Sequence, residues 1–129
     1  MKLIVLVKEV PDTYGDRVLS LETGLADRAA SEAVLDEISE RALEAALAFR
    51  DGNADAEVVA LAVAPAGSVA TVRKALAMGA DRAVHVADEA LLGADVVLTA
   101  EVIAAAVKRE GFDVVVAGNA STDGSSGMV

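Results

Sequence analysis

The chain has 129 residues, no cysteine and a formal net charge of −10. This length suffices for one domain with a hydrophobic core, and the lack of cysteine excludes disulfides, thiolate metal sites and a cysteine nucleophile. The negative charge argues against nucleic-acid binding, although backbone amides can still hold the phosphate of a single nucleotide. No run reaches the roughly 20 apolar residues of a membrane span. We therefore expect a cytoplasmic protein without direct membrane insertion.

The first third of the sequence predicts a buried strand, an excursion and a helix. Residues 3–7 form an apolar run flanked by lysines, which is typical of a strand buried on both faces. Residues 16–30 are mixed and polar and indicate a short hairpin or an irregular excursion. Residues 32–50 have helical spacing, with Ser31 as the candidate N-cap and residues 51–53 as the stop. The expected apolar face of this helix is Leu35, Ile38, Ala42, Ala45 or Ala46, and Phe49.

The remainder of the chain continues the alternation of strands and helices. Ser68 is a candidate N-cap, Gly79 and Gly111 are helix ends, and Met78 is expected in the core. Such alternation predicts an α/β fold, a doubly wound parallel sheet in a Rossmann-like three-layer sandwich, as one domain over residues 1–129. The expected elements are a strand at 58–63, a helix at 68–78, a strand at 82–88, a helix at 95–109 and a buried strand at 114–117.

A loop rich in glycine and hydroxyl groups, GNASTDGSSGMV, follows the last expected strand. In parallel sheets the ligand lies beyond the carboxyl ends of the strands, which here are residues 8–13, 63–67, 86–88 and 118 onward. Glycines let the backbone approach a ligand closely, and backbone amides suit an anion. The loop therefore predicts a nucleotide or phosphate site, the alternative being a surface loop of turn residues. It matches neither the Walker motif nor the dinucleotide fingerprint.

The residues do not indicate catalytic or metal chemistry. His85 lies within a strand and is interpreted as structural, and the acidic pairs at 36–37 and 88–89 are interpreted as solvated faces or caps. The serines of the last loop have no evident base, so a hydrolase would lack an activated nucleophile. Lys8 follows the first strand, where it either meets a phosphate or simply flanks a buried strand.

Four stretches together are more specific, and they occur in a fixed order. They are MKLIVLVKEVPDT at the start, LDEISERALEAAL at 35–47, ALAMGADRAVHV at 75–86 and FDVVVAGNASTDG at 112–124. With these stretches the chain resembles the beta subunit of the electron-transfer flavoprotein, and bacterial members most. The resemblance covers the whole chain but only about the N-terminal half of such a subunit. We therefore expect a fragment whose C-terminal half is absent.

The resemblance implies a function without bond-breaking chemistry. In that family the beta subunit binds AMP structurally and pairs with an alpha subunit that carries the redox-active FAD. The pair accepts electrons from acyl-CoA and related dehydrogenases, as in fatty acid oxidation, and passes them to a quinone oxidoreductase at the membrane.

The resemblance also implies a set of nucleotide-binding residues. Thr13 and Leu35 match positions near the flavin of the alpha subunit, and residues 33–36 are expected at the start of the first long helix. Many family members have an Asn-Pro pair before this helix, where the present chain has AVLDE. The expected AMP contacts are Leu6, Ala33, Val34, Leu35, Asp36, Val63, Gly118, Asn119, Ala120, Ser121, Thr122, Asp123, Gly124, Ser125, Ser126, Gly127, Met128 and Val129.

Three alternatives remain open from the sequence. Some relatives bind a second FAD in place of AMP and bifurcate electrons, and their loop tends to read Asp-Gly-Asp-Thr, whereas Ser125 and Ser126 follow Asp123-Gly124 here. An ATP-using α/β enzyme would need glycines after the first strand, which KEVPDT lacks. A stand-alone nucleotide sensor of the universal-stress type would have a longer glycine spacing in its last loop.

Overall fold

A four-stranded parallel sheet forms the centre of the computed structural model, which describes residues 1–127. The strands follow the order β5-β4-β1-β6, which confirms the predicted α/β class with its parallel sheet. In the register, Ile4 of the central strand lies between Val59 on one side and Val115 on the other. The bounds of the four strands are Lys2–Leu6 for β1, Glu57–Val63 for β4, Arg82–Val86 for β5 and Val114–Val116 for β6.

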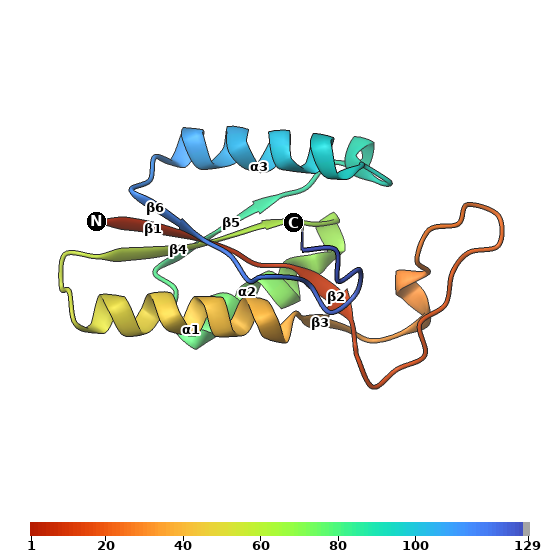
Figure 1. Ribbon diagram of the computed structural model, residues 1–129, viewed down its shortest axis with the longest axis horizontal. Coiled ribbons are helices and arrows are strands. Elements are labelled where there is room, and N and C mark those ends of the chain that lie inside the picture. The colour runs from red at the N-terminus through yellow and green to blue at the C-terminus, as the bar shows by residue number, and fades with distance from the viewer. Residues whose placement is uncertain (128–129) are drawn as a thin grey trace.

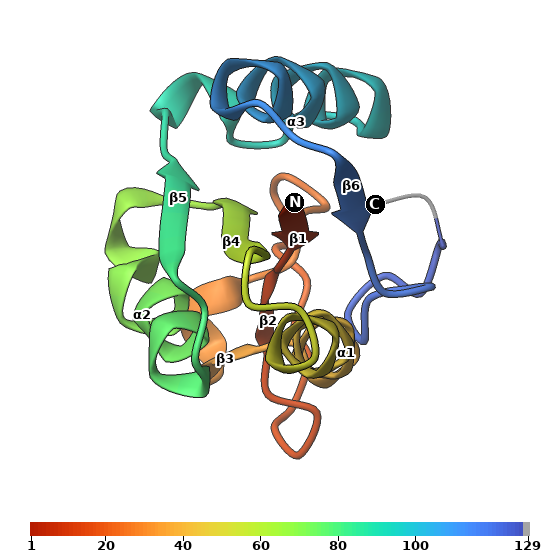
Figure 2. The ribbon, with the colours of Figure 1, turned by 90° about the vertical axis from the view of Figure 1, so that its left-hand side faces the viewer.

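Helices cover both faces of this sheet. Helices α1 (Glu37–Asp51) and α2 (Val69–Met78) lie on one face, and α3 (Val96–Glu110) lies on the other (Figures 1 and 2). The chain steps from β1 to β4 to β5 in one direction, and then returns through α3 to β6 on the far side of β1. The strand order therefore reverses between β1 and β6, and the carboxyl ends of these two strands form the topological switch point at which such sheets bind ligands.

The two faces of the sheet differ in how well they are packed. The face under α1 and α2 buries fourteen hydrophobic residues in one cluster. The face under α3 buries a cluster of four. Alternation along the strands assigns Leu3 and Val5 to the first face and Ile4 to the second. Helix α3 itself contributes Val107 as its one buried residue, so the layer over this face is loosely filled.

A small antiparallel ribbon precedes α1 and corrects the expected start of this helix. Strand β2 (Glu9–Pro11) pairs with β3 (Ala33–Leu35), so residues 33–35 are extended and α1 begins at Glu37 rather than at residue 32. The N-cap is Asp36, whose side chain accepts from Ser39 N, and the prediction of Ser31 as the cap is wrong. The physical reason is the ladder with β2, which offers residues 33–35 backbone partners that a sequence-local helix pattern does not reveal.

The excursion between β2 and β3 contains a short hairpin, in agreement with one of the two predicted forms. Leu19 and Ala26 form an antiparallel bridge, and a 3-10 turn at Arg28–Ala30 leads into β3. Figure 1 shows this excursion, in orange, projecting from the end of the molecule where the strands of the sheet end.

The apolar face of α1 agrees in part with the predicted one. The buried positions are Ser39, Ala42, Leu43, Ala46 and Leu47, which confirms Ala42 and, of the two alternatives at 45 and 46, Ala46. Leu35 is buried as expected, but in β3 and not in the helix, and the predicted place of Phe49 in the core is wrong, since it is 40% exposed. In α2 the core-facing residues are Val72 and Ala75, while Val69 and Leu76 are largely exposed.

The ends of α2 agree with the prediction in part, and Met78 packs against the core as expected. Gly79 ends the helix with a φ of 122°, a conformation that favours glycine. Ser68 stands at the start, but its hydroxyl donates to Glu9 Oε1 at 2.7 Å, so it does not cap the helix. Two further 3-10 turns span Ala66–Ser68 and Glu89–Leu91.

Strand β6 is an edge strand, and its predicted burial is wrong. Val114 and Val115 are each 40% exposed, because β6 has a neighbour on one side only and α3 covers its face incompletely. Within the described residues, no helix combines the length and the apolar character needed to cross a membrane.

Candidate functional site

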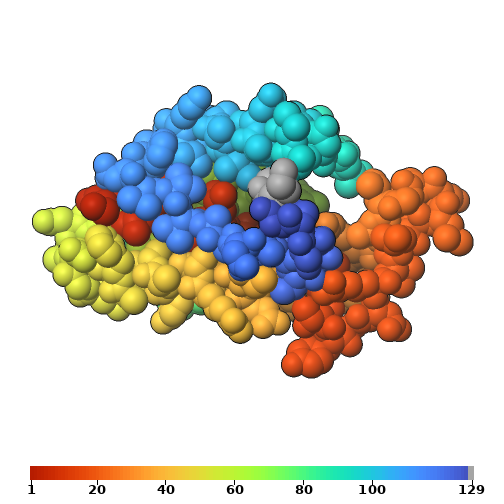
Figure 3. Space-filling model, viewed as in Figure 1, coloured from red at the N-terminus to blue at the C-terminus, as the bar shows by residue number. Residues whose placement is uncertain are grey.

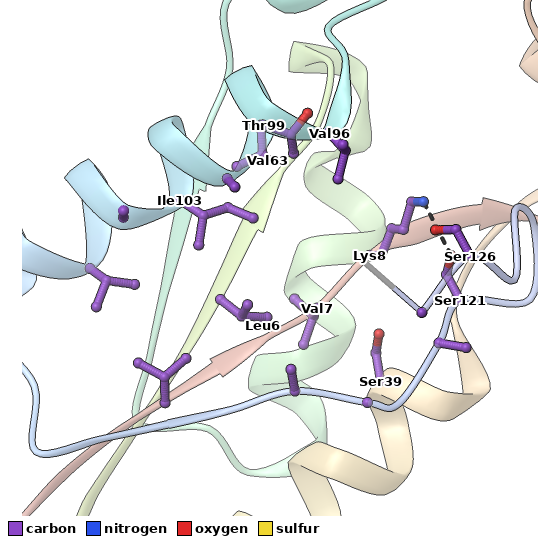
Figure 4. Close-up of a pocket in the computed structure, with 18 of the residues that line it drawn as sticks. Leu6, Val7, Lys8, Ser39, Val63, Val96, Thr99, Ile103, Ser121 and Ser126 are labelled. Atoms are coloured by element: carbon purple, nitrogen blue, oxygen red, sulfur yellow. Dashed lines mark hydrogen bonds between the residues drawn. The ribbon is translucent and has the colours of Figure 1, made fainter. Parts of the chain in front are cut away.

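A cavity of about 700 Å³ lies at the switch point between β1 and β6. It extends from the carboxyl ends of the strands to the inner side of α3, and the loop after β6 closes it toward α1 (Figure 4). The lining residues are Leu6, Val7, Lys8, Arg28, Ser39, Val63, Ala94, Val96, Thr99, Ala100, Ile103, Ala104, Val107, Lys108, Phe112, Val115, Ala117, Gly118, Ala120, Ser121, Ser126 and Gly127.

The two ends of the cavity differ in chemistry. One wall is apolar and comes from β1, β4 and α3, where Leu6, Val63 and Ile103 face the space (Figure 4). The opposite rim carries the ammonium of Lys8 beside the hydroxyls of Ser121 and Ser126. Such an arrangement suits an amphipathic ligand with a flat apolar part and an anionic or hydroxylated part.

Gly118 allows the loop after β6 to lie directly on the first turn of α1. A Cβ atom at this position would stand 2.6 Å from Cγ2 and 3.3 Å from the carbonyl oxygen of Ile38, which is too close for any side chain. Further along, Ser125 and Gly127 have φ values of 53° and 66°, and Ser125 N donates to Ser121 O at 2.9 Å. Residues 118–127 therefore form a tight turn whose backbone faces the cavity at both ends.

Asp36 fastens this loop to the start of α1. Its carboxylate is fully buried, and Oδ1 accepts from Thr122 N at 3.1 Å and from Thr122 Oγ1 at 2.7 Å, while Oδ2 accepts from Ser39 N at 3.3 Å. The backbone N of Asp36 donates to Lys8 O at 2.9 Å. One residue thus joins the segments after β1, before α1 and after β6. The side chain of Asp36 does not line the cavity, and it contributes to the site by holding Thr122 of the loop against the start of α1.

Asp123 gathers a second set of polar contacts at the mouth of the cavity. Its Oδ1 accepts from Ser121 Oγ at 2.6 Å, from Gly124 N at 2.7 Å and from Lys8 Nζ at 3.1 Å, and its Oδ2 lies 3.3 Å from Arg28 Nη2. Arg17 also donates to Asp123 O at 3.4 Å. Figure 3 shows the last loop, in dark blue, against the excursion that carries both arginines.

These contacts control the ionisation of Asp123. Partial burial alone would raise the pKa of its carboxyl, but the hydrogen bonds from Ser121, Lys8 and Gly124 N and the charge of Lys8 outweigh that effect. The pKa therefore falls well below the ordinary value of 3.8, and the group is charged at neutral pH.

The structure brings together some of the residues expected at the nucleotide. Leu6, Val63 and five residues of the last loop line the cavity. The other described residues of this set do not line it, and among them Leu35 is buried in the core as part of β3. Thr13, which was predicted near the flavin of the alpha subunit and not at the nucleotide, is exposed in the loop after β2. The predictions for Met128 and Val129 lie outside the described residues. The five lining loop residues are Gly118, Ala120, Ser121, Ser126 and Gly127, and the remaining predicted residues are Ala33, Val34, Asp36, Asn119, Thr122, Asp123, Gly124 and Ser125.

Sequence reasoning missed Arg28, Ser39 and the inner side of α3. Arg28 reaches the site only because the excursion folds back against the last loop, and the sequence gives no signal for that return. The side of α3 was detectable, because Val96, Ile103 and Val107 recur at helical spacing along the cavity wall.

Other chemistry in the described part of the chain is sparse. The described residues contain no group of three or more histidines or carboxylates placed to hold a metal ion. His85 Nε2 lies 2.9 Å from Ala64 O, a contact that joins β5 to the loop after β4 and fits the structural interpretation of this histidine. A second cavity of about 670 Å³ lies between the segments 63–67 and 87–92, and it is lined mainly by small apolar residues.

Comparison with known proteins gives this fold and cavity a family. The family described as the electron transfer flavoprotein domain matches residues 23–129. Electron transfer flavoprotein subunit beta of Mycobacterium tuberculosis is 45% identical over 132 residues, which cover 98% of this chain and 50% of that protein. The subunit beta of Clostridium acetobutylicum is 36% identical over 100% of this chain and 49% of that protein. Subunit CarD of the caffeyl-CoA reductase-Etf complex of Acetobacterium woodii is 35% identical with the same coverage.

The parallel sheet with helices on both faces defines an α/β protein of the doubly wound type. The chain belongs to the electron transfer flavoprotein domain family, as a homologue of the beta subunit. It spans about half the length of the curated relatives it matches.

Proposed function

We propose that the chain is the nucleotide-binding part of an electron-transfer flavoprotein beta subunit and that the cavity between β1, β6 and α3 binds AMP as a structural cofactor. The observation that carries the proposal is the cavity itself. A volume of about 700 Å³ lies at the switch point, and the glycine-rich loop expected to hold the nucleotide forms one of its walls. Volumes in this range are typical of small-molecule and cofactor sites.

The chemistry of the cavity supports a nucleotide in particular. The apolar wall of Leu6, Val63 and Ile103 suits the faces of an adenine ring. The rim of Lys8, Ser121 and Ser126 offers one charge and two hydroxyls to a ribose phosphate. Since the chain carries a net charge of −10, the ammonium of Lys8 at the rim is the feature that makes an anionic ligand acceptable here.

The wider function follows from family membership and is part of the same proposal. We infer a heterodimer in which an alpha subunit holds the redox-active FAD, while the present chain contributes its nucleotide and the residues around Thr13 and Leu35 near the flavin. The assembly would carry electrons from acyl-CoA and related dehydrogenases to a quinone oxidoreductase. The chain itself would break no bonds, so it would act as a carrier subunit and not as an enzyme.

FAD in place of AMP is the second candidate ligand of the same cavity. It is favoured by the 35% identity to a subunit of the caffeyl-CoA reductase-Etf complex. The loop residues Ser125 and Ser126, which stand where the sequence pattern of FAD-binding relatives has Asp-Thr, favour AMP.

The test is to purify the natural protein with its co-purifying subunit, denature it and identify the released nucleotides by chromatography and mass. We expect one FAD and one AMP for each pair of subunits. If two FAD and no AMP are released, the ligand of the cavity is FAD and not AMP. If no adenine nucleotide is released, the proposal is overturned.

A further inference from the structure

The mouth of the cavity has more positive charge than its own carboxylate neutralises. Lys8 Nζ and Arg28 Nη2 both contact Asp123, at 3.1 and 3.3 Å. The guanidinium of Arg17 lies against the backbone carbonyl of the same residue. Two cations therefore share one carboxylate, and a third stands beside it.

Three cations around one carboxylate stand out in so acidic a chain, in which Asp and Glu outnumber Lys and Arg by 21 to 11. The other ion pairs of the described residues are mixed: Arg50 contacts Asp51 and Asp81, whereas Glu57 contacts both Lys2 and Arg82. A concentration of cations in so acidic a chain creates a local positive potential, which attracts an anion.

The cations come from two segments of the chain that are distant in sequence. Lys8 follows β1, Arg28 belongs to the 3-10 turn before β3, and both line the cavity. The Lys8 side chain is 37% exposed and can therefore be reached by a ligand, whereas the side chain of Asp123 is 13% exposed. Lys8 also donates to Ser121 Oγ at 3.3 Å, so its ammonium stands at the rim next to the loop (Figure 4).

We propose that Lys8 and Arg28 bind the phosphate of the nucleotide and that, without nucleotide, the Asp123 carboxylate takes the place of that phosphate between them. The inference rests on the proposed function and names the side chains that recognise the anion. A phosphate monoester carries a charge of about −1.5 to −2 at pH 7 and three acceptor oxygens, so it neutralises two cations better than one carboxylate does.

If phosphate and the Asp123 carboxylate compete for the same cations, substitutions of Lys8 and of Asp123 should change the affinity for AMP in opposite directions. Removing the Lys8 charge weakens AMP binding and leaves adenosine binding unchanged, because adenosine has no phosphate. Neutralising Asp123 as Asn strengthens AMP binding, because Lys8 and Arg28 lose their internal competitor. The Asn side-chain oxygen can still accept from Ser121 Oγ and Gly124 N, so the shape of the loop is kept.

The experiment compares AMP and adenosine by calorimetry on the full-length natural protein with its partner subunit, freed of bound nucleotide. The variants are Lys8→Met, Arg28→Gln, Asp123→Asn and the control Lys74→Met, whose lysine pairs with Glu40 away from the cavity lining. We expect Lys8→Met to weaken AMP binding by about tenfold or more, as for the loss of a hydrogen bond to a charged group. Arg28→Gln weakens it in the same direction, Asp123→Asn tightens it severalfold, and Lys74→Met matches the wild type.

The outcomes separate this inference from the proposed function. If Lys8→Met weakens AMP and adenosine equally, Lys8 supports the fold and the inference fails while the nucleotide site stands. If Asp123→Asn leaves AMP affinity unchanged or lowers it, the exchange is overturned, and an equal loss for adenosine would make Asp123 a ribose ligand. Wild-type protein that binds neither compound would overturn the proposed function together with the inference. A misfolded variant cannot imitate the tighter binding expected of Asp123→Asn.

Discussion

The two faces of the sheet show how differently one chain can use its apolar residues. Under α1 and α2, Leu43, Ala46 and Leu47 pack against Leu3, Val5 and the inner residues of β4, and the layer is closed. Under α3, most apolar residues are partly exposed, a small cluster around Val107 joins the helix to the sheet, and the cavity runs beside that cluster. The first face stabilises the fold, while the second leaves a volume in which a ligand can take the place of side chains.

The comparison explains why the site lies where it does. The strand order reverses between β1 and β6, and in open parallel sheets a crevice lies outside the carboxyl ends of the strands at such a reversal. The close packing of α1 then fixes one wall of this crevice through Asp36 and Gly118. The well-packed face thus provides the rigid support on which the loop of the open face is held.

The largest expected difference between the faces is in stability. Leu43 is fully buried under α1, and Leu43→Ala should lower the free energy of unfolding by about 2–5 kcal/mol, because it leaves a cavity in a closed layer. Ile103 borders a cavity that is already open, so Ile103→Ala should cost about 1 kcal/mol, below the usual range for such a truncation. Urea titration of the full-length protein measures both. Equal losses would contradict the comparison.

A smaller effect is expected where the two faces meet. In Gly118→Ala the new methyl group would overlap Ile38, so the loop must move off α1, at a cost of about 1–3 kcal/mol as for other overpacked sites. AMP affinity should fall with it, because the loop carries the rim of the cavity. The matched control is Gly124→Ala, since an added Cβ there meets no atom within 4 Å. Denaturation and AMP titration of both variants provide the measurement, and similar behaviour of the two would show that the contact with α1 does not fix the loop.

The smallest expected effect concerns the pH dependence of stability. The folded-state pKa of Asp123 lies below its ordinary value of 3.8, so its contacts stabilise the protein above that pH. This contribution is lost as the pH falls below about 3.8 toward the folded-state pKa, because the unfolded chain then binds the proton more readily. The stability gap between wild type and Asp123→Asn should therefore shrink from pH 6 to pH 3 in denaturant titrations. A gap that stayed constant would contradict the ion cluster at the mouth of the cavity.

Much of the fold, and less of the site, was predictable from the sequence. The parallel strands and the last two helices were predictable, because apolar runs and helical spacing are local signals. The ribbon of β2 and β3 was not, because its strands have three residues each and pair across the excursion. The pairing of β2 with β3 folds the excursion back on itself, which brings Arg28 to Asp123. It also moves the start of α1 to Glu37, so that Asp36 becomes the N-cap and holds the loop after β6. Local sequence patterns predicted the loop after β6, whereas its neighbours Arg28 and Ser39 are brought to it by tertiary contacts.

The decisive measurement is a crystal structure of the natural protein with the nucleotide it carries. We expect electron density for an adenine nucleotide in the cavity between α3, β1 and β6. Its ring would lie against the apolar wall of Leu6 and Ile103, and its phosphate would lie at Lys8 and the loop 118–127. A nucleotide bound in the cavity at residues 63–67 and 87–92, or on the face of α1 and α2, would contradict it.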